Sequence, residues 1–465
     1  MAKLTFYGAT ETVTGSRFLL EIKDLKLLID CGLFQGPKEN RLKNWEPFPV
    51  PPSEISAVLL THAHIDHIGY LPRLSKDGFS GPIICTHPTA ELSKILLKDS
   101  AHLQEEDAAW ANKKGFSKHD PALPLFTVED AEACIGQFSS FHYGDEVSLN
   151  GDIRLKFRDS GHILGSAFID IKISHGEQDS RKILFCGDLG RPARVILRDP
   201  VQVYNIDYLV VESTYGDRLH ADNSFYDELT KVINESIERG GVLIIPSFAV
   251  GRTQTLLYVI RELEELGKIP ILPVYLDSPM ALEATTIYEK QIPSQNLRSR
   301  VQTIMGKKIF RTGDMRLCES RKKSQAINDV RDRAIIISSS GMITGGRIMH
   351  HMMQRLPNPK DTVLFVGYQA EGTRGRTILN GAPTVKIHGE EVPIKAKIEN
   401  ITGLSGHADY NETLAWMMGF NRGPKKIFVV HGEKDARKSL AEKITTQFEW
   451  EVALPEFQES YILDL

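Results

Sequence analysis

Residues 58–69 read VLLTHAHIDHIG, an apolar run followed at once by three histidines and an aspartate. The apolar residues are typical of a buried strand, and the polar residues follow where that strand would end. Imidazole nitrogen suits zinc, and a nearby carboxylate can bind a metal or orient a water. A lone histidine is more often an ordinary core or surface residue, and this chain has 15 of them. Four ligand-type residues packed as H-x-H-x-D-H instead predict a metal centre formed by His62, His64, Asp66 and His67.

Further candidate ligands stand at the ends of other predicted strands. Asp30 ends the run 27–29, His162 lies in DSGHILGS (159–166), Asp188 ends FCGD (185–188), and His431 follows the run 427–430. Taken alone, His162 or His431 is as readily an ordinary residue as a ligand. Their positions after strands and beside glycines favour a place in the same centre.

Composition sets limits on the class of protein. The 465 residues carry a formal charge of -4, which excludes a histone-like way of holding nucleic acid, and 41% hydrophobic residues are ordinary for a globular chain. The five cysteines are dispersed without a C-x-x-C pair, which favours a reducing cytoplasm over a disulfide framework. No run approaches the ~18 apolar residues that a membrane span needs, so we expect no membrane partner.

The predicted pattern of helices and strands changes twice along the chain. Short β-rich runs at 3–7, 17–22 and 26–30 predict an antiparallel start, and a long helix is expected at 90–114. From about residue 215, amphipathic helices alternate with apolar strands, which is typical of a parallel α/β unit. Short strands are expected again at 394–401 and 426–430. The chain therefore predicts a strand-rich domain, 1–209 and 394–465, interrupted by an α/β insertion at 210–393.

The histidine cluster resembles that of the metallo-β-lactamase fold hydrolases, in which it supplies ligands to two metal ions. The resemblance implies an α/β fold, the αββα sandwich of that family. It also implies that His62, His64 and His162 hold one zinc ion, that Asp66, His67 and His431 hold the other, and that Asp188 bridges them. Asp30 is then expected behind the ligands, fixing the histidine loop. The cluster alone suits phosphodiester, β-lactam, thioester and lactone hydrolysis equally well.

Three further motifs narrow the resemblance. VVESTYGD (210–217), LSGHAD (404–409) and His431 are similar to the extra motifs of the β-CASP nucleases, whose insertion interrupts the lactamase fold. The match covers essentially the whole chain. Within the family, the chain is similar to the RNA-cleaving branch that includes the pre-mRNA 3′-end cleavage endonuclease. RNA-acting members carry histidine at the third motif, where the DNA cross-link repair branch typically carries valine. The resemblance thus implies a zinc-dependent ribonuclease acting in RNA processing or decay.

The resemblance also implies catalytic roles for Asp66, Glu212 and His407. His407 is expected to act as general acid toward the departing 3′-oxygen, leaving a 3′-hydroxyl and a 5′-phosphate. Glu212 is expected to orient His407 and raise its pKa. The alternative for Glu212 is a capping or salt-bridged carboxylate at a strand end.

Two Ser/Gly segments of the insertion are candidates for binding the RNA backbone. They are IPSFAVGRTQ (245–254) and SSSGMITGGR (338–347), where small residues allow backbone N–H groups to approach a phosphate. Neither is a P-loop, and both read equally well as ordinary turns. GYQAEGTRGR (367–376) adds two arginines, which the family resemblance implies are phosphate ligands. The predicted substrate-binding residues are Ser247, Arg252, Ser340, Gly341, Arg374 and Arg376.

Charge is concentrated in one segment. Residues 298–323 hold nine Lys and Arg against Asp314 and Glu319, a surplus of +7, so the rest of the chain carries -11. Such a run is either a solvated face or a guide for RNA. Single-stranded RNA is the expected partner, and the endonuclease and 5′-exonuclease modes are both open. A homodimer is compatible with the sequence, although no motif establishes one. The other classes to weigh are an esterase or DNA hydrolase of the same fold and an inactive scaffold.

Overall fold

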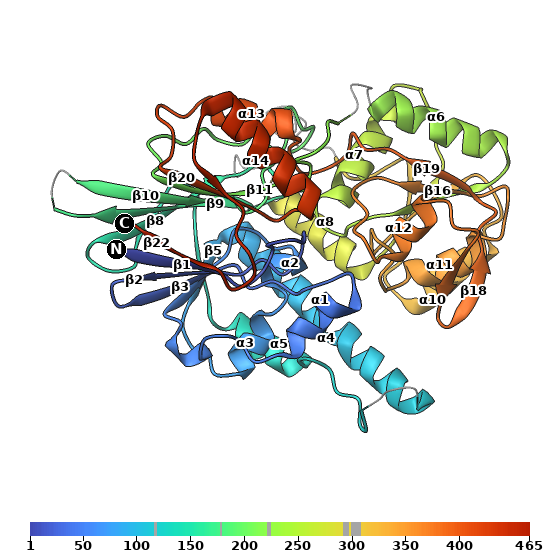
Figure 1. Cartoon of the computed structure of the whole chain (residues 1–465). Helices are drawn as coiled ribbons and strands as arrows, with labels where there is room; N and C mark the ends of the chain where they lie inside the picture. Colours follow the sequence, from blue (N-terminus) through green and yellow to red (C-terminus); the bar gives the residue numbers. More distant parts are fainter. Residues whose placement is uncertain (116–118, 177–178, 221–224, 292–296, 299–307) are drawn as a thin grey trace. The chain divides into compact units, whose positions relative to one another are not determined.

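Strand pairing divides the chain into two units in the computed structural model (Figure 1), which describes all residues except 116–118, 177–178, 221–224, 292–296 and 299–307. Unit 1 consists of Met1–Leu219 and His407–Leu465, and unit 2 consists of His220–Gly406. The two ends of the chain meet in unit 1, because the first strand, β1 (Ala2–Phe6), pairs with the last, β22 (Ser460–Leu463).

The first sheet of unit 1 has seven strands in the order β22-β1-β2-β3-β4-β5-β6. The strands β1 to β3 are antiparallel, as predicted, with a two-residue turn (23–24) between β2 and β3, whereas β3 to β6 are parallel. The remaining bounds are β2 (Phe18–Ile22), β3 (Leu25–Ile29), β4 (Ala57–Leu59), β5 (Ile83–Thr86) and β6 (Phe138–Phe141).

The second sheet of unit 1 has the order β21-β20-β11-β10-β9-β8-β7. Its strands are β7 (Glu146–Ser148), β8 (Ile153–Asp159), β9 (Ala167–Ser174), β10 (Ser180–Phe185), β11 (Tyr208–Glu212), β20 (Lys426–Val430) and β21 (Val452–Ala453). Alternate residues of both sheets, such as Leu4, Ile29, Ile171 and Phe428, form one buried core between them. The remaining face of β10, β11 and β20 packs against helices.

Helices cover the outer faces of this sandwich. On the first sheet they are α2 (Ile65–Ile68), α3 (Leu71–Lys76), α4 (His87–Lys114) and α5 (Val128–Ile135), with α1 (Lys38–Leu42) beside them. On the second sheet α13 (Tyr410–Met417) and α14 (Lys434–Phe448) bury Leu414, Leu440 and Ile444 against β11 and β20 (Figure 1). Thr86 caps α4 by accepting a hydrogen bond from the Thr89 N–H, and Gly115 ends that helix in the left-handed conformation. The αββα arrangement is confirmed.

Unit 2 is an α/β unit around a parallel six-stranded sheet with the order β14-β13-β15-β12-β16-β19. Its strands are β12 (Val242–Pro246), β13 (Pro273–Asp277), β14 (Asp314–Leu317), β15 (Ala334–Ser338), β16 (Thr362–Phe365) and β19 (Lys397–Asn400), and β17 (Thr384–Ile387) pairs with β18 (Glu390–Pro393). Its helices are α6 (Phe225–Glu238), α7 (Arg252–Glu265), α8 (Pro279–Gln291), α10 (Arg321–Ala326), α11 (Ile348–Arg355) and α12 (Arg374–Leu379).

The edges of the two units differ from the boundaries expected at 209/210 and 393/394. The strand β11 continues to Glu212 and pairs with β20, so the first crossing falls after Leu219. The strand β19 pairs with β16 and therefore belongs to unit 2, although its sequence was expected to return to the strand-rich domain. No helix in the described part of the chain combines the length and apolar character that a membrane crossing requires.

Candidate metal centre

The predicted ligands of unit 1 lie together at the carboxyl ends of strands from both sheets. His62, His64 and Asp66 follow β4, Asp30 follows the neighbouring strand β3, and Asp188 follows β10. Parallel pairing of β10, β11 and β20 brings Asp188, the last residue of β11 and His431 to one edge. Residues more than 360 positions apart in the chain are thus neighbours, as the Nε2 atoms of His67 and His431 are 3.2 Å apart.

The first group of ligand atoms has the dimensions of a zinc site. His62 Nε2 and His162 Nε2 lie 3.0 and 3.2 Å from His64 Nδ1, and both lie 3.3 Å from Asp188 Oδ2. Ligand atoms about 2.0–2.1 Å from a tetrahedral zinc ion are about 3.3 Å apart, which matches these separations. All four side chains are buried or nearly so. The three nitrogens and one oxygen therefore fit a zinc ion.

The second group is formed by Asp66, His67 and His431. His431 Nε2 lies 3.3 Å from Asp66 Oδ2, and His67 Nε2 lies 3.3 Å from Asp188 Oδ1. The two oxygens of Asp188 thus face different groups, and Oδ1 has no hydrogen-bond partner among the described residues. A buried carboxylate oxygen without a partner is costly unless a cation neutralises it. This arrangement fits a carboxylate that bridges two metal ions.

Burial keeps the histidines of the first group neutral, as metal ligation requires. It lowers the pKa of His62 to about 3, with His67 contributing, and lowers the pKa of His64 to about 4. The pKa of His162 is also well below its ordinary value because of burial. Burial alone raises the pKa of Asp188, but the histidines around it, led by His431 and His67, lower it well below its ordinary value.

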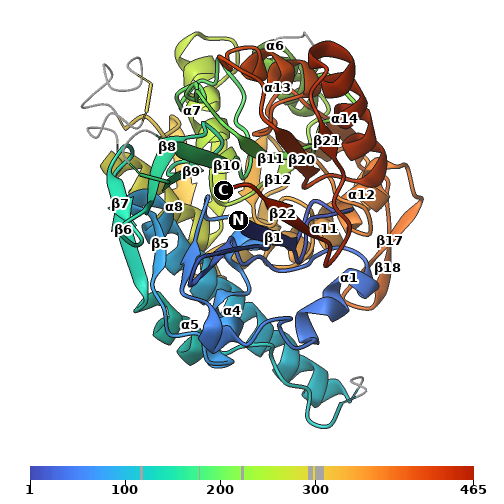
Figure 2. The same ribbon diagram turned by 60° about the vertical axis from the view of Figure 1, so that its left-hand side comes forward.

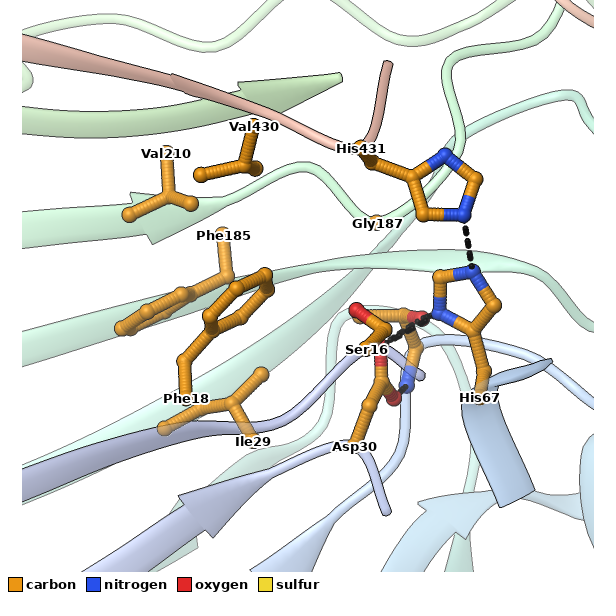
Figure 3. A pocket seen from close by; sticks show the side chains of 11 residues that line it. Ser16, Phe18, Ile29, Asp30, His67, Phe185, Gly187, Val210, Val430 and His431 are labelled. Atoms are coloured by element: carbon orange, nitrogen blue, oxygen red, sulfur yellow. Dashed lines mark hydrogen bonds and ion pairs between the residues drawn. The ribbon is translucent and has the colours of Figure 1, made fainter. Parts of the chain in front are cut away.

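Asp30 holds the ring of His67 in place (Figure 3). Its Oδ2 atom lies 2.7 Å from His67 Nδ1, which leaves Nε2 of that ring facing the ligand group. Asp30 and His431 both have left-handed backbone conformations, with φ of 57° and 48°. Non-glycine residues adopt this region at a cost and cluster at functional sites. The cavity beside them, of about 10 Å³, has room for about one water molecule and cannot admit a substrate.

His407 and Glu212 form a close pair beside the ligands. His407 Nδ1 lies 2.9 and 3.1 Å from the two oxygens of Glu212 and 3.8 Å from Asp188 Oδ2. Burial opposes protonation of His407, but Glu212 and Asp188 outweigh it and raise the pKa of His407 to about 9. Glu212 is itself fixed, because its Oε1 accepts a hydrogen bond from the Leu189 N–H. A protonated imidazole beside the ligands can donate a proton.

Two threonines also orient the ligands, and sequence reasoning did not single them out. Thr61 Oγ1 donates to Asp30 Oδ2 over 2.7 Å and lies 3.0 Å from His62 Nδ1. Thr214 Oγ1 lies 3.3 Å from His431 Nδ1. Their position could have indicated this role, because each lies two residues after a strand end, within one of the sequence motifs described above.

In unit 2 the Ser/Gly segments lie side by side at the carboxyl ends of β12 and β15. Ser247 is buried and accepts a hydrogen bond from Thr253 Oγ1, and Ser340 Oγ bonds Thr344. A Cβ on Gly341 would lie 2.9 Å from the Phe248 ring, so glycine permits this approach. Gln369, which the sequence did not suggest, donates to the Gly341 carbonyl over 3.1 Å. The structure brings these two loops together without testing whether they bind a phosphate.

The three predicted arginines of unit 2 contact main-chain atoms. Arg374 donates through Nε to the Lys386 carbonyl and through Nη1 to the Ile343 carbonyl, and Arg376 reaches the Gln369 carbonyl at 3.5 Å. The Arg252 guanidinium packs against Gly367, where a Cβ would lie 2.9 Å from Nη1. These contacts brace the loops that carry Ser340 and Gln369, and substrate binding by the three residues stays a prediction.

Only part of the basic segment 298–323 is described. Arg300 and Lys307 lie outside the described residues. Arg316 pairs with Asp314 at 2.8 Å, and Lys323 pairs with Glu319 at 3.0 Å, so the only two carboxylates of this segment are already engaged. The role of the segment as a guide for RNA stays a prediction.

One buried acid near the centre carries a stability prediction. Burial raises the pKa of Asp159 to about 7, and only Gly161 N–H and Arg198 oppose this. Because the folded pKa exceeds the unfolded value, ionisation destabilises the fold as pH rises from about 4 to 7 and fully above that. Replacing Asp159 with asparagine should therefore raise the free energy of unfolding at pH 8 by on the order of 2–4 kcal/mol and leave it unchanged at pH 4. Urea melts at both pH values measure this, and an equal effect at pH 4 and pH 8 would contradict it.

Comparisons with known proteins agree with this geometry. Residues 19–191 match the metallo-beta-lactamase superfamily domain, residues 253–378 match the Beta-Casp domain, and residues 391–455 match the Zn-dependent metallo-hydrolase RNA specificity domain. A solved structure titled as a protein of unknown function from Enterococcus faecalis superposes with a TM-score of 0.55 over 99% of this chain and 100% of that one, at 14% identity, which shows a shared fold.

Curated relatives match over nearly the whole chain. Ribonuclease TTHA0252 of Thermus thermophilus is 35% identical over 97% of this chain and 98% of its own length. An RNase J-like protein of Methanocaldococcus jannaschii is 30% identical over 95% of each chain. The transcription termination factor FttA of the same organism is 31% identical over 97% of this chain and 70% of its own. With its ligand cluster intact and its lactamase fold interrupted by an α/β unit, the chain belongs to the β-CASP family of metallo-β-lactamase-fold, metal-dependent nucleases.

Proposed function

We propose that this chain is a ribonuclease that uses two zinc ions to hydrolyse phosphodiester bonds of single-stranded RNA. The observation that carries the proposal is the complete set of ligand atoms, divided into two groups by the two oxygens of Asp188 and flanked by the His407–Glu212 pair. Metal-dependent hydrolysis of RNA in RNA processing follows from the family, its RNA specificity domain and relatives named as ribonucleases. The number of ions and the single-stranded substrate are finer statements, which we propose.

Two zinc ions fit the donor atoms. His62, His64 and His162 would hold one ion, Asp66, His67 and His431 the other, and Asp188 would contact both. When bound, such ions lower the pKa of a water and neutralise charge on a phosphoryl oxygen. Asp30 and Thr61 keep the rings of His67 and His62 oriented, which preserves the shape of the site between turnovers.

His407 is the proposed general acid. Its Nδ1 faces Glu212, so Nε2 is the ring nitrogen left to donate a proton to the departing 3′-oxygen. Glu212 keeps the ring in this orientation and favours its charged form. Asp66 is proposed to contact the reacting phosphate in addition to the zinc ion that it shares with His67 and His431. Its side chain is more exposed than those of His67 and Asp188.

The proposal extends to the location of the reaction and the partners. All five cysteines are buried and unpaired, which fits a reducing cytoplasm. In unit 2, the adjoining loops of Ser247, Ser340 and Gly341 are proposed to contact the RNA backbone together with Arg252, Arg374 and Arg376. A homodimer is compatible with these roles, because the residues of the centre all belong to one chain.

Metal removal tests the proposed function directly. We expect the purified protein to cleave a labelled, unstructured RNA, to lose this activity in a zinc chelator, and to regain it when zinc is restored. His64→Ala should abolish cleavage while leaving RNA binding largely intact, because the loops proposed to contact RNA lie in unit 2, whereas the His64 ring contacts the predicted ligands His62 and His162 in unit 1. Metal-replete protein that leaves RNA intact but opens a lactone would overturn the proposal.

A further inference from the structure

The outer face of the second sheet of unit 1 carries a row of cations that the proposed catalysis does not use. The strands β8, β9 and β10 pair antiparallel, and their register places Arg154 opposite Lys172 and Lys172 opposite Lys182. Residues that are directly opposite point to the same face, with Cβ atoms about 4.5–5.5 Å apart. Three positive side chains therefore stand side by side across three strands.

Two more cations extend this row along β8 toward the metal centre. Lys156 and Arg158 follow Arg154 at every second position, so they share its face and rise by about 6.8 Å per pair of residues. Arg158 is four residues before the ligand His162. We call Arg154, Lys156, Arg158, Lys172 and Lys182 the cationic strip. It runs from the far end of the strands to the end that carries the ligands.

The strip is open to solvent where the sheet is not covered. The helices α13 and α14 pack over β11, β20, Leu184 of β10 and Phe168 of β9, which stands opposite Arg158. Arg158, at this covered end of the strip, keeps 33% of its side-chain surface in solvent. In Figure 2 both helices lie on the side of β11 and β20. The Arg154 side chain is 51% exposed and Lys172 is exposed, while Lys182 keeps 24% of its side-chain surface in solvent. These side chains can therefore reach a ligand that lies flat on the sheet.

The carboxylates nearby do not neutralise the strip. Glu146 pairs with Arg154 and Lys156, and Asp170 lies 2.8 Å from Arg158 and 4.0 Å from Lys182. Within the described residues no ion pair involves Lys172, the middle cation of the row. Five cations thus face two carboxylates, in a unit that as a whole has 31 Lys and Arg against 40 Asp and Glu, a formal charge of -9.

Like charges directly opposite each other destabilise a sheet, so this row is not explained by the fold. A polyanion would offset the repulsion and release counterions on binding. We infer that the cationic strip binds the phosphate backbone of the RNA substrate at a distance from the cleavage site. The inference rests on the proposed function, because that function supplies the polyanion. Base identity is not read here, since the strip offers charge without stacking aromatic rings.

The test compares the salt dependence of binding in the His64→Ala background, where RNA is not cleaved. The variant Arg154→Gln, Lys172→Gln, Lys182→Gln should bind a 30-nucleotide unstructured RNA about 10–100-fold more weakly at low salt. Its slope of log K against log salt should be shallower by about 2, since each phosphate contact on a single strand contributes about 0.7. Lys172→Gln alone should reduce the slope by about 0.7 if the triple variant does not fold.

A control variant with the same charge change separates local from global effects. Lys98, Lys113 and Lys114 are exposed residues of α4, and replacing them with glutamine should leave the slope unchanged. Equal slopes for the strip and control variants would overturn the inference. It would also be overturned if the strip variant lost binding to anionic lipid vesicles but bound RNA as its parent does. With His64 restored, the metal-replete strip and control variants should cleave a four-nucleotide RNA at the same rate as the wild-type parent. Failure of the parent to cleave it would instead overturn the proposed function.

Discussion

Replacing Asp188 with alanine should lower kcat for RNA cleavage by about 10³-fold or more and reduce the zinc content of the purified protein below two per chain. Both oxygens of this buried carboxylate face ligand groups, Oδ2 toward His62 and His162 and Oδ1 toward His67. Its removal would therefore take one donor from each group and leave the positive charge of the two proposed zinc ions less neutralised. Metal analysis of the protein and single-turnover cleavage of labelled RNA measure the two effects.

Asp207→Ala is the matched control for that variant. Asp207 is also a buried carboxylate next to the second sheet, but it pairs with Arg422 at 2.9 Å and has no histidine partner among the residues that the structure describes. It should cost stability without changing the zinc content. A protein that loses Asp188 and still holds two zinc ions at unchanged affinity would show that this residue does not bridge them.

Replacing His407 with glutamine should lower kcat by about 10²–10⁴-fold while leaving the zinc content unchanged. The expected loss follows from the removal of a proton donor that lies beside the ligands but in neither three-residue ligand group. Glu212→Gln should cost less, about 10–100-fold, because the amide still accepts a hydrogen bond but no longer supplies charge. RNA cleavage at saturating substrate measures these losses.

A leaving group that needs no proton distinguishes acid catalysis from a structural role. A nitrophenyl phosphodiester releases a stable anion, so His407→Gln should hydrolyse it at close to the parent rate. Asp188→Ala should lose activity on both substrates. Equal losses of His407→Gln on RNA and on the dye would mean that the ring supports the site rather than donating the proton.

The clustering of the candidate ligands was predictable from sequence because strand ends are local features. Each of His62, Asp188 and His431 follows an apolar run that is long enough to be recognised, and carboxyl ends of parallel strands meet at one edge of a sheet. Antiparallel pairing in the first three strands was predicted from short β-rich runs separated by turn residues, and it is confirmed.

Features that depend on pairing partners or side-chain direction were not predictable. The strand β19 has only four residues and no hydrophobic run, so nothing local indicates that it pairs with β16 rather than returning to unit 1. Arg374 was expected to face a phosphate, but its direction depends on how α12 packs, and its guanidinium bonds carbonyls of β17 and the Ser/Gly loop. Thr61 and Thr214 carry no motif of their own, and only the folded geometry shows what they touch.

The division of unit 1 around unit 2 has a consequence during synthesis. Glu212 and His431 are 219 residues apart, a stretch that a ribosome translates in about 10–45 s at about 5–20 residues per second. Throughout that interval the nascent chain has the strands β1 to β6 and the histidine loop but lacks β20, β22 and His431. A nuclease assembled this way stays harmless to the messenger that encodes it until the last sixty or so residues have emerged and closed the sandwich.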